Sequence, residues 1–172
     1  MRKGLTVLGF ALVLSFGMCT TLAEESDVPK LQMISEIGTM SNTGHYEDAL
    51  EKCNEAIKKY PKEPELYYWS ATIKSKLGDN KSAIKDYDEA IVLNPKNGSA
   101  YVMRGISKSD IDDYDGAISD FDKALSINPK DSSAYSMRAC TKIQMGDIDG
   151  ALKDMQTANK LMDEEEAVAK QK

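Results

Sequence analysis

Three prolines, Pro61, Pro95 and Pro129, stand 34 residues apart in this chain. Two series of alanines keep the same interval, one beginning at Ala49 and the other at Ala56. This period is typical of a helix–turn–helix unit, and such a unit cannot bury its apolar face alone, so several must stack. The sequence therefore predicts an all-α chain built as a solenoid of antiparallel helix pairs.

The prolines also divide the chain into segments. The expected units are 30–63, 64–97, 98–131 and 132–165, with a short linker at 24–29 and a polar tail at 166–172. Gly44, Gly78 and Gly146 fall at the turn inside a unit, where a left-handed glycine closes the first helix without steric cost. Unit three has Asp112 at this position, so we expect its turn to be slightly altered.

Small residues stand where the two helices of a unit must approach each other. Ala71, Gly105 and Ala139 hold this position in the first helices of units two to four, facing the alanines of the second helices. A larger residue such as Phe121 follows on the second helix and is expected to fill the gap to the next unit. Cys53 shares that position, so we interpret it as an inert core residue.

The units resemble tetratricopeptide repeats from residue 30 to residue 165, most completely over 64–131. The residues that coincide with the family's signature are Ala71, Gly78, Ala83, Tyr87, Ala90 and Pro95 in unit two, and Tyr101, Gly105, Ala117, Phe121, Ala124 and Pro129 in unit three. The resemblance implies a right-handed α-α superhelix whose first helices line a concave groove. It also implies a non-catalytic scaffold that binds a protein or peptide segment there.

The resemblance further implies which side chains line the groove. Carried over by position, the candidates are Ile34, Glu65, Tyr68, Thr72, Lys76, Val102, Ile106, Asp110, Ser136, Cys140 and Gln144. Hydroxyls and aliphatic side chains dominate this surface, which suits an extended or helical apolar segment with modest polar anchoring. Lys76 is its one basic residue, so it does not resemble the family's carboxylate clamp, which holds the acidic tails of chaperones.

Opposite charges recur sixteen residues apart. The pairs are Arg104 with Asp120, Arg138 with Asp154 and, with the signs exchanged, Glu36 with Lys52. Because the exchange keeps the charges opposite, we expect the two positions to lie close together. The alternative is a set of independently solvated charges. Exposed pairs contribute only about 0–1 kcal/mol, so either interpretation is structural.

The first 23 residues differ in kind from the repeats. Arg2 and Lys3 precede an uncharged, mostly apolar run at 5–18, and a small polar stretch ends at Ala23. This order is typical of a secretory signal peptide, which we place at 1–23. The protein is therefore expected to be exported, to a periplasm or out of the cell.

Two alternatives to a cleaved signal peptide stay open. An uncleaved N-terminal anchor is one, although the apolar run is shorter than the roughly 20 residues that a membrane span needs. Attachment of a lipid at Cys19 is the other, and it would make the protein an envelope lipoprotein. Because that run is short, we expect membrane attachment only if Cys19 carries a lipid.

Composition narrows the function classes. The chain is 41% hydrophobic and 29% charged, which fits a folded globular chain. Its net charge of −6, without a basic stripe, argues against nucleic acid as a partner. His45 is the single histidine, and no metal-ligand spacing or phosphate loop is present. We therefore predict no enzymatic activity, no cofactor and no small-molecule substrate.

The predicted partner is a protein or peptide. A self-assembling structural protein is the second hypothesis, because stacks with imperfect ends can continue into neighbouring chains. Cys53 and Cys140 lie nearly three repeats apart, so we do not expect them to form a disulfide within one chain.

Overall fold

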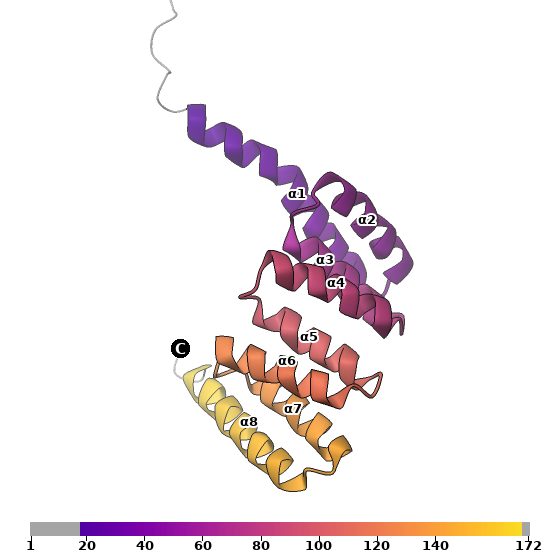
Figure 1. The fold of residues 1–172 in the computed structure, drawn as a ribbon. Helices are drawn as coiled ribbons and strands as arrows, with labels where there is room; N and C mark the ends of the chain where they lie inside the picture. The colour runs from indigo at the N-terminus through magenta and orange to yellow at the C-terminus, as the bar shows by residue number, and fades with distance from the viewer. Residues whose placement is uncertain (1–17, 170–172) are drawn as a thin grey trace, which may run out of the picture.

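The computed structural model describes residues 18–169, with the surroundings of side chains described from Val28 onward. This part of the chain forms eight helices and no strand: α1 (Met18–Asn42), α2 (Tyr46–Lys59), α3 (Pro64–Lys76), α4 (Asn80–Leu93), α5 (Gly98–Ser109), α6 (Tyr114–Ile127), α7 (Ser132–Met145) and α8 (Ile148–Ala169). The helices form four antiparallel pairs that stack in chain order (Figure 1). The molecule is thus an all-α solenoid, as predicted.

The first helix is longer than the repeat predicts. Residues 24–29, expected as a linker, continue α1, and Pro29 lies inside the helix. A proline removes one helical hydrogen bond and disfavours helix at the preceding residue, yet α1 continues through Pro29. Downstream of Pro29 the helix is held by packing against α2 and α3.

The predicted signal peptide lies mostly outside the described residues. Positions 1–17 are not described, and residues 18–23 form the first turns of α1. Within the described range, no helix combines the length and the apolar character that crossing a membrane requires.

The turn inside each unit contains one left-handed residue. Gly44, Gly78 and Gly146 have φ angles of 83°, 85° and 84°, which confirms the predicted role of glycine. Asp112 also adopts a positive φ, of 66°, and the hydroxyl of Tyr114 donates a hydrogen bond to its carboxylate at 2.6 Å. Unit three therefore keeps the left-handed turn without its glycine, because aspartate tolerates this conformation better than most residues.

Side-chain oxygens cap the starts of the middle helices. Each capping carboxylate or amide accepts a hydrogen bond from the backbone N–H three residues further on. The four caps are Asp79 on α4, Asn97 on α5, Asp113 on α6 and Asp131 on α7. These local bonds fix where each helix begins and so set the register of the stack.

The helices of a unit meet at their small residues. Ala71 and Ala139 are buried, and Gly105 lies so close to α6 that an added Cβ would stand 2.9 Å from the ring of Phe121. Phe121 itself is 1% exposed and clusters with Ala134 of the next unit. The buried residues form three clusters, and each of them, together with the side chains packed against it, joins residues of neighbouring units, as expected for stacked repeats.

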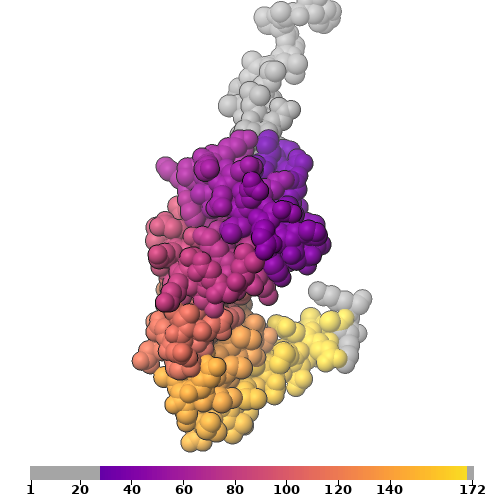
Figure 2. Space-filling model, turned by 90° about the vertical axis from the view of Figure 1, so that its right-hand side faces the viewer, coloured from indigo at the N-terminus to yellow at the C-terminus, as the bar shows by residue number. Residues whose placement is uncertain are grey.

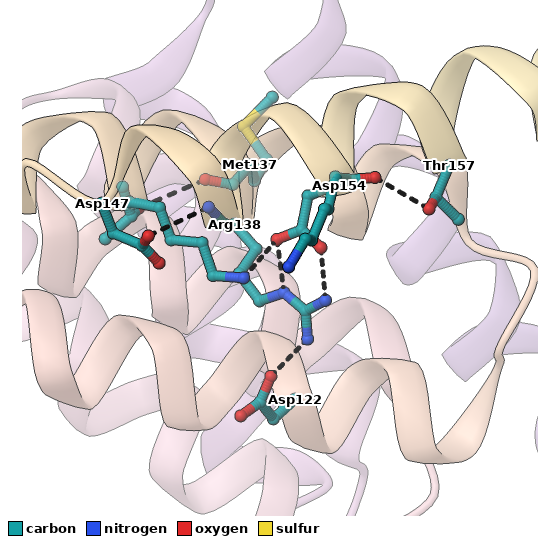
Figure 3. A network of polar contacts seen from close by, with 10 residues as sticks. Asp122, Met137, Arg138, Asp147, Asp154 and Thr157 are labelled. Atoms are coloured by element: carbon teal, nitrogen blue, oxygen red, sulfur yellow. Dashed lines mark hydrogen bonds and ion pairs between the residues drawn. The ribbon is translucent and has the colours of Figure 1, made fainter.

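Arginines join neighbouring units through two carboxylates each. In Figure 3, Arg138 donates from Nε and Nη2 to the two oxygens of Asp154, at 2.8 and 2.6 Å, and from Nη1 to Asp122 of the preceding unit. We call this arrangement the inter-unit clamp. The second clamp joins Arg104 to Asp120 and Asp88.

The clamps confirm that the predicted charge positions lie close together, and they show that these are not exposed pairs. Asp120 and Asp154 are 3% and 4% exposed. A carboxylate at this depth depends on its partners, because leaving it unpaired costs far more than an exposed pair contributes. Lys52 contacts Glu36 in unit one, as predicted.

The junction between units one and two is built without an arginine. Ser70 occupies the position of the clamp arginines and donates to Asp86, which also pairs with Lys74. In unit one, Asn54 stands where units two and three have Asp88 and Asp122. This junction therefore relies on apolar packing. The two residues at the clamp positions, Ser70 and Asn54, are uncharged.

Candidate peptide-binding groove

The first helices of the units line one face of the stack. Helices α1, α3, α5 and α7 contact one another in succession, whereas over the described residues no two of the second helices α2, α4, α6 and α8 touch. A stack whose first helices are closer together than its second helices must curve toward the first helices. The first helices therefore line the concave face, as the family resemblance implies.

One hollow lies where α3 and α5 begin. Its volume is about 340 Å³, and its lining residues are Glu63, Pro64, Glu65, Tyr68, Asn94, Asn97 and Ser99. Tyr68 is half-buried, with its ring centroid 5.9 Å from those of Trp69 and Tyr87 in edge contacts. Burial raises the pKa of the Tyr68 hydroxyl, so it stays a neutral hydrogen-bonding group. Two predicted residues, Glu65 and Tyr68, meet here.

A second hollow of about 140 Å³ lies between α5 and α7. Its lining residues are Ile106, Ser109, Asp110, Phe121, Met137, Cys140, Thr141 and Gln144. Ser109 donates to the amide oxygen of Gln144 at 3.0 Å, and Asn80 donates to Asp110 at 3.3 Å. Four predicted residues, Ile106, Asp110, Cys140 and Gln144, are brought together in this hollow.

Three of the predicted groove residues are buried beneath the surface of the groove. Ile34 and Val102 are each 7% exposed within apolar clusters, and Thr72 is buried with its hydroxyl 3.1 Å from that of Tyr87. Neighbouring side chains cover all three of them. A bound segment could not contact them without displacing that packing.

The remaining two predicted residues lie apart from these hollows. Lys76 is exposed but lines neither of them. Ser136 is half-buried beside Cys140 at the end of the stack, in a third hollow formed by α7 and α8. Ser136 therefore lies on the outer face of the last unit, whereas Cys140 lines both that face and the second hollow of the groove.

Some lining residues were missed by the sequence reasoning. Asn94 and Asn97 reach the first hollow from the loop between units, although transferring family positions considers only helices. Their signal was the polar loop on both sides of Pro95. Met137 and Thr141 enter the second hollow from the side of α7 that packs on unit three, which depends on the angle between helices.

The side chains that line the groove include apolar, hydroxyl and amide groups, which can recognise a ligand. Within residues 28–169, no three His, Cys, Asp or Glu side chains gather where they could hold a metal ion. Burial raises the pKa of Cys53 to about 12, so this thiol is unreactive near neutral pH, as its core position predicts. Cys140 is exposed.

Several solved structures have a similar fold, and one of them contains a bound peptide. A crystal structure of MamA has a TM-score of 0.74 at 21% identity, covering 86% of each chain. A thermophilic TPR protein of Thermus thermophilus has a TM-score of 0.71 at 21% identity, covering 78% of this chain and 75% of that one. The first TPR of Spaghetti (RPAP3), bound to the HSP90 peptide SRMEEVD, has a TM-score of 0.65 at 20% identity, covering 68% and 93%. At these identities the likeness shows the fold.

Family comparison is more specific. No curated protein matches the sequence significantly. A family model described as tetratricopeptide repeat matches residues 64–97 and 98–131, and a second model with the same description matches 121–153. These matches extend over more than half of the chain, and the stacked helix pairs continue on either side of them. The chain belongs to the tetratricopeptide repeat family.

Proposed function

We propose that this protein is an exported, non-catalytic scaffold that binds a peptide or protein segment in its concave groove. The observation that carries the proposal is the pair of hollows along α3, α5 and α7, each with an apolar side chain beside hydroxyls or amides. Such a surface supports binding through shape and a few hydrogen bonds.

The charges of the groove favour an occupant that is not acidic. Glu65 and Asp110 are exposed there, while Lys76 lies outside both hollows. An acidic tail would meet like charges without a cluster of bases to hold it. The fitting occupant is an apolar segment, extended or helical, with amide or basic groups near Glu65 and Asp110.

The groove can be tested with peptides selected from a random library on the purified full chain. We expect Tyr68→Ala combined with Ile106→Ser to weaken the selected peptides at least about tenfold, because both hollows lose their apolar anchor. Val92→Ser is the matched control, since Val92 is an apolar residue of α4 that is 72% exposed outside the groove. Isothermal titration calorimetry measures the affinities, and circular dichroism checks that all variants stay helical.

If the double variant is folded and binds every selected peptide as tightly as the wild type, groove binding is wrong. Weakening by Val92→Ser to the same extent would contradict it too, because the effect would then not be confined to the concave face.

Export rests on the signal peptide expected at 1–23 and is tested separately. Intact-mass measurement of the protein from an envelope fraction should show a chain that begins at Glu24. A lipid on Cys19 would instead assign the protein to the lipid-anchored class, and an unprocessed chain in the cytoplasm would contradict export.

A further inference from the structure

The stack ends on an uncovered face formed by α7 and α8, at the bottom of Figure 1. Its residues surround a hollow of about 160 Å³ and are Ser136, Ala139, Cys140, Ile143, Met155, Ala158 and Asn159. We call this surface the end face. Among the described residues no other helix packs on it, and the last turns of α8 project away from the body of the stack (Figure 2).

The end face includes a repeat position that is buried in every other unit. Cys53, Tyr87 and Phe121 are 0%, 0% and 1% exposed, because each packs against the first helix of the following unit. Met155 holds the same position in unit four and is 46% exposed, and Ile143 beside it is 48% exposed. The end face is thus continuous with the interface that joins the repeats, and it lacks only the covering helix.

The covering helices inside the stack define what this surface accepts. Each contributes residues at positions i, i+3 and i+7, with a large side chain in the middle. The three sets are Leu66, Trp69 and Ile73 on α3, Ala100, Met103 and Ser107 on α5, and Ala134, Met137 and Thr141 on α7. An occupant of the end face therefore needs an amphipathic helix with this spacing.

The clamp position selects among such helices. Asp88 and Asp122 each receive an arginine from the covering helix, at position i+4. Where the receiving residue is the uncharged Asn54, the covering helix has Ser70 at that position. Gln156 is the equivalent residue on the end face, so the matching helix carries an uncharged residue there.

The start of the stack does not provide this helix. The equivalent positions of α1 are Gln32, Ser35 and Thr39, all exposed and polar, with Glu36 at i+4. A second copy stacked head to tail would thus cover an apolar surface with a polar one, which forfeits the apolar burial that holds the other junctions together.

We propose that the end face is a second docking surface, adjoining the groove at Cys140, for an amphipathic helix of a partner protein. The helix would sit as the first helix of a fifth unit, with apolar or small residues at i, i+3 and i+7 and an uncharged residue opposite Gln156.

Fluorescence anisotropy with a dye-labelled synthetic helix tests the proposal on the purified full chain. The probe is an alanine-, glutamate- and lysine-based peptide with leucine, tryptophan, serine and isoleucine at the spacing of Leu66, Trp69, Ser70 and Ile73. We expect saturable binding that Met155→Glu weakens by about tenfold or more, because a carboxylate would be buried in the contact. Val92→Glu, at an exposed apolar residue of α4, should leave the affinity unchanged.

A reciprocal change tests the clamp position. A probe with arginine in place of the serine should bind Gln156→Asp about tenfold more tightly than the wild type. The variant with Tyr68→Ala and Ile106→Ser should keep wild-type affinity for the serine probe, which separates this surface from the groove.

The proposal is overturned if the folded wild type does not bind the serine probe, or if Met155→Glu binds it equally well. It is also overturned if light scattering shows a dimer that Met155→Glu dissociates, because the end face would then belong to a second copy of the chain.

Discussion

Individual side chains set how closely the two helices of a unit approach. Gly105 is the clearest case, because the site of its missing Cβ lies 2.9 Å from the Phe121 ring and 3.2 Å from the carbonyl oxygen of Ala117. A backbone oxygen cannot rotate away, so any side chain at residue 105 must push α5 and α6 apart. Glycine is required there by space and not by backbone conformation.

Gly105→Ala should therefore destabilise the protein by about 1–3 kcal/mol. Gly98→Ala is the matched control, because the nearest atom to its added Cβ lies at 3.8 Å, in ordinary contact. Urea unfolding followed by circular dichroism measures both free energies of unfolding. Equal stabilities for the two variants would contradict the close approach seen at Gly105.

Asp112 is the one non-glycine residue with a positive φ among residues 18–169. Asp112→Gly should raise the free energy of unfolding by up to about 1 kcal/mol, because glycine adopts this conformation without steric cost. The substitution also removes the hydrogen bond from Tyr114, so it is compared with Tyr114→Phe, which removes only that bond. If Asp112→Gly is no more stable than Tyr114→Phe, the residue is not strained.

The inter-unit clamps act between helices. Arg138 on α7 joins α8 of its own unit to α6 of the preceding unit, and Lys142 adds an ion pair to Asp154 at 2.8 Å. A planar guanidinium can donate to two carboxylates at once, which a single ammonium group does less well. The clamps therefore set the angle between units as well as adding stability.

Arg138→Met should lower the free energy of unfolding by about 1–3 kcal/mol, because Asp154 stays buried with only Lys142 to pair with. Adding Asp154→Asn to this variant should recover part of the loss, since the unpaired charge is then removed. Thermal and urea unfolding of the two single variants and the double variant measure the coupling. Strictly additive effects would mean that the two residues do not depend on each other.

Low pH should weaken the clamp between Arg138 and Asp154. Burial by itself would raise the pKa of Asp154, but hydrogen bonds from Arg138 and Lys142 outweigh burial and hold it below the usual value. Its contribution to stability is therefore present above the unfolded pKa of about 3.9 and is lost as the pH falls through the lower folded value. Unfolding free energies measured from neutral pH down to about pH 3 should fall less steeply for Asp154→Asn than for the wild type. Parallel curves would contradict the assignment.

At the scale of the whole molecule, the two ends of the stack differ. Unit one presents polar residues outward, whereas unit four presents the end face, and α8 beyond Leu161 is exposed at every described residue. In a stack, each unit is stabilised only by its neighbours, so the ends are the least stable parts.

Hydrogen exchange should follow that difference. We expect amide protection to be highest in α4 to α7 and to fall along α8 after Leu161, where buried contacts are few. Exchange measured by mass spectrometry on the full chain tests this order. Protection of the last turns of α8 equal to that of α6 would show that something covers them in solution.

The sequence predicted the local features of the fold well. The 34-residue interval, the left-handed turn residues and the charge pairs sixteen residues apart all depend on short-range geometry that recurs in each unit. The groove was predicted less completely, because Ile34, Thr72 and Val102 proved to be buried while Asn94 and Asn97 reached the first hollow from a loop. Whether a groove position is exposed depends on how much of it the next helix covers.

The sequence by itself determined the family, the all-α architecture and the residues that meet within one unit, because a repeated pattern reports the same local packing several times. Only the tertiary structure decided which surfaces stay open. Met155 and Phe121 hold the same repeat position, yet one is exposed and the other buried, since the difference is the presence of a following helix. Exposure is a property of neighbours, and the pattern within a repeat does not contain it.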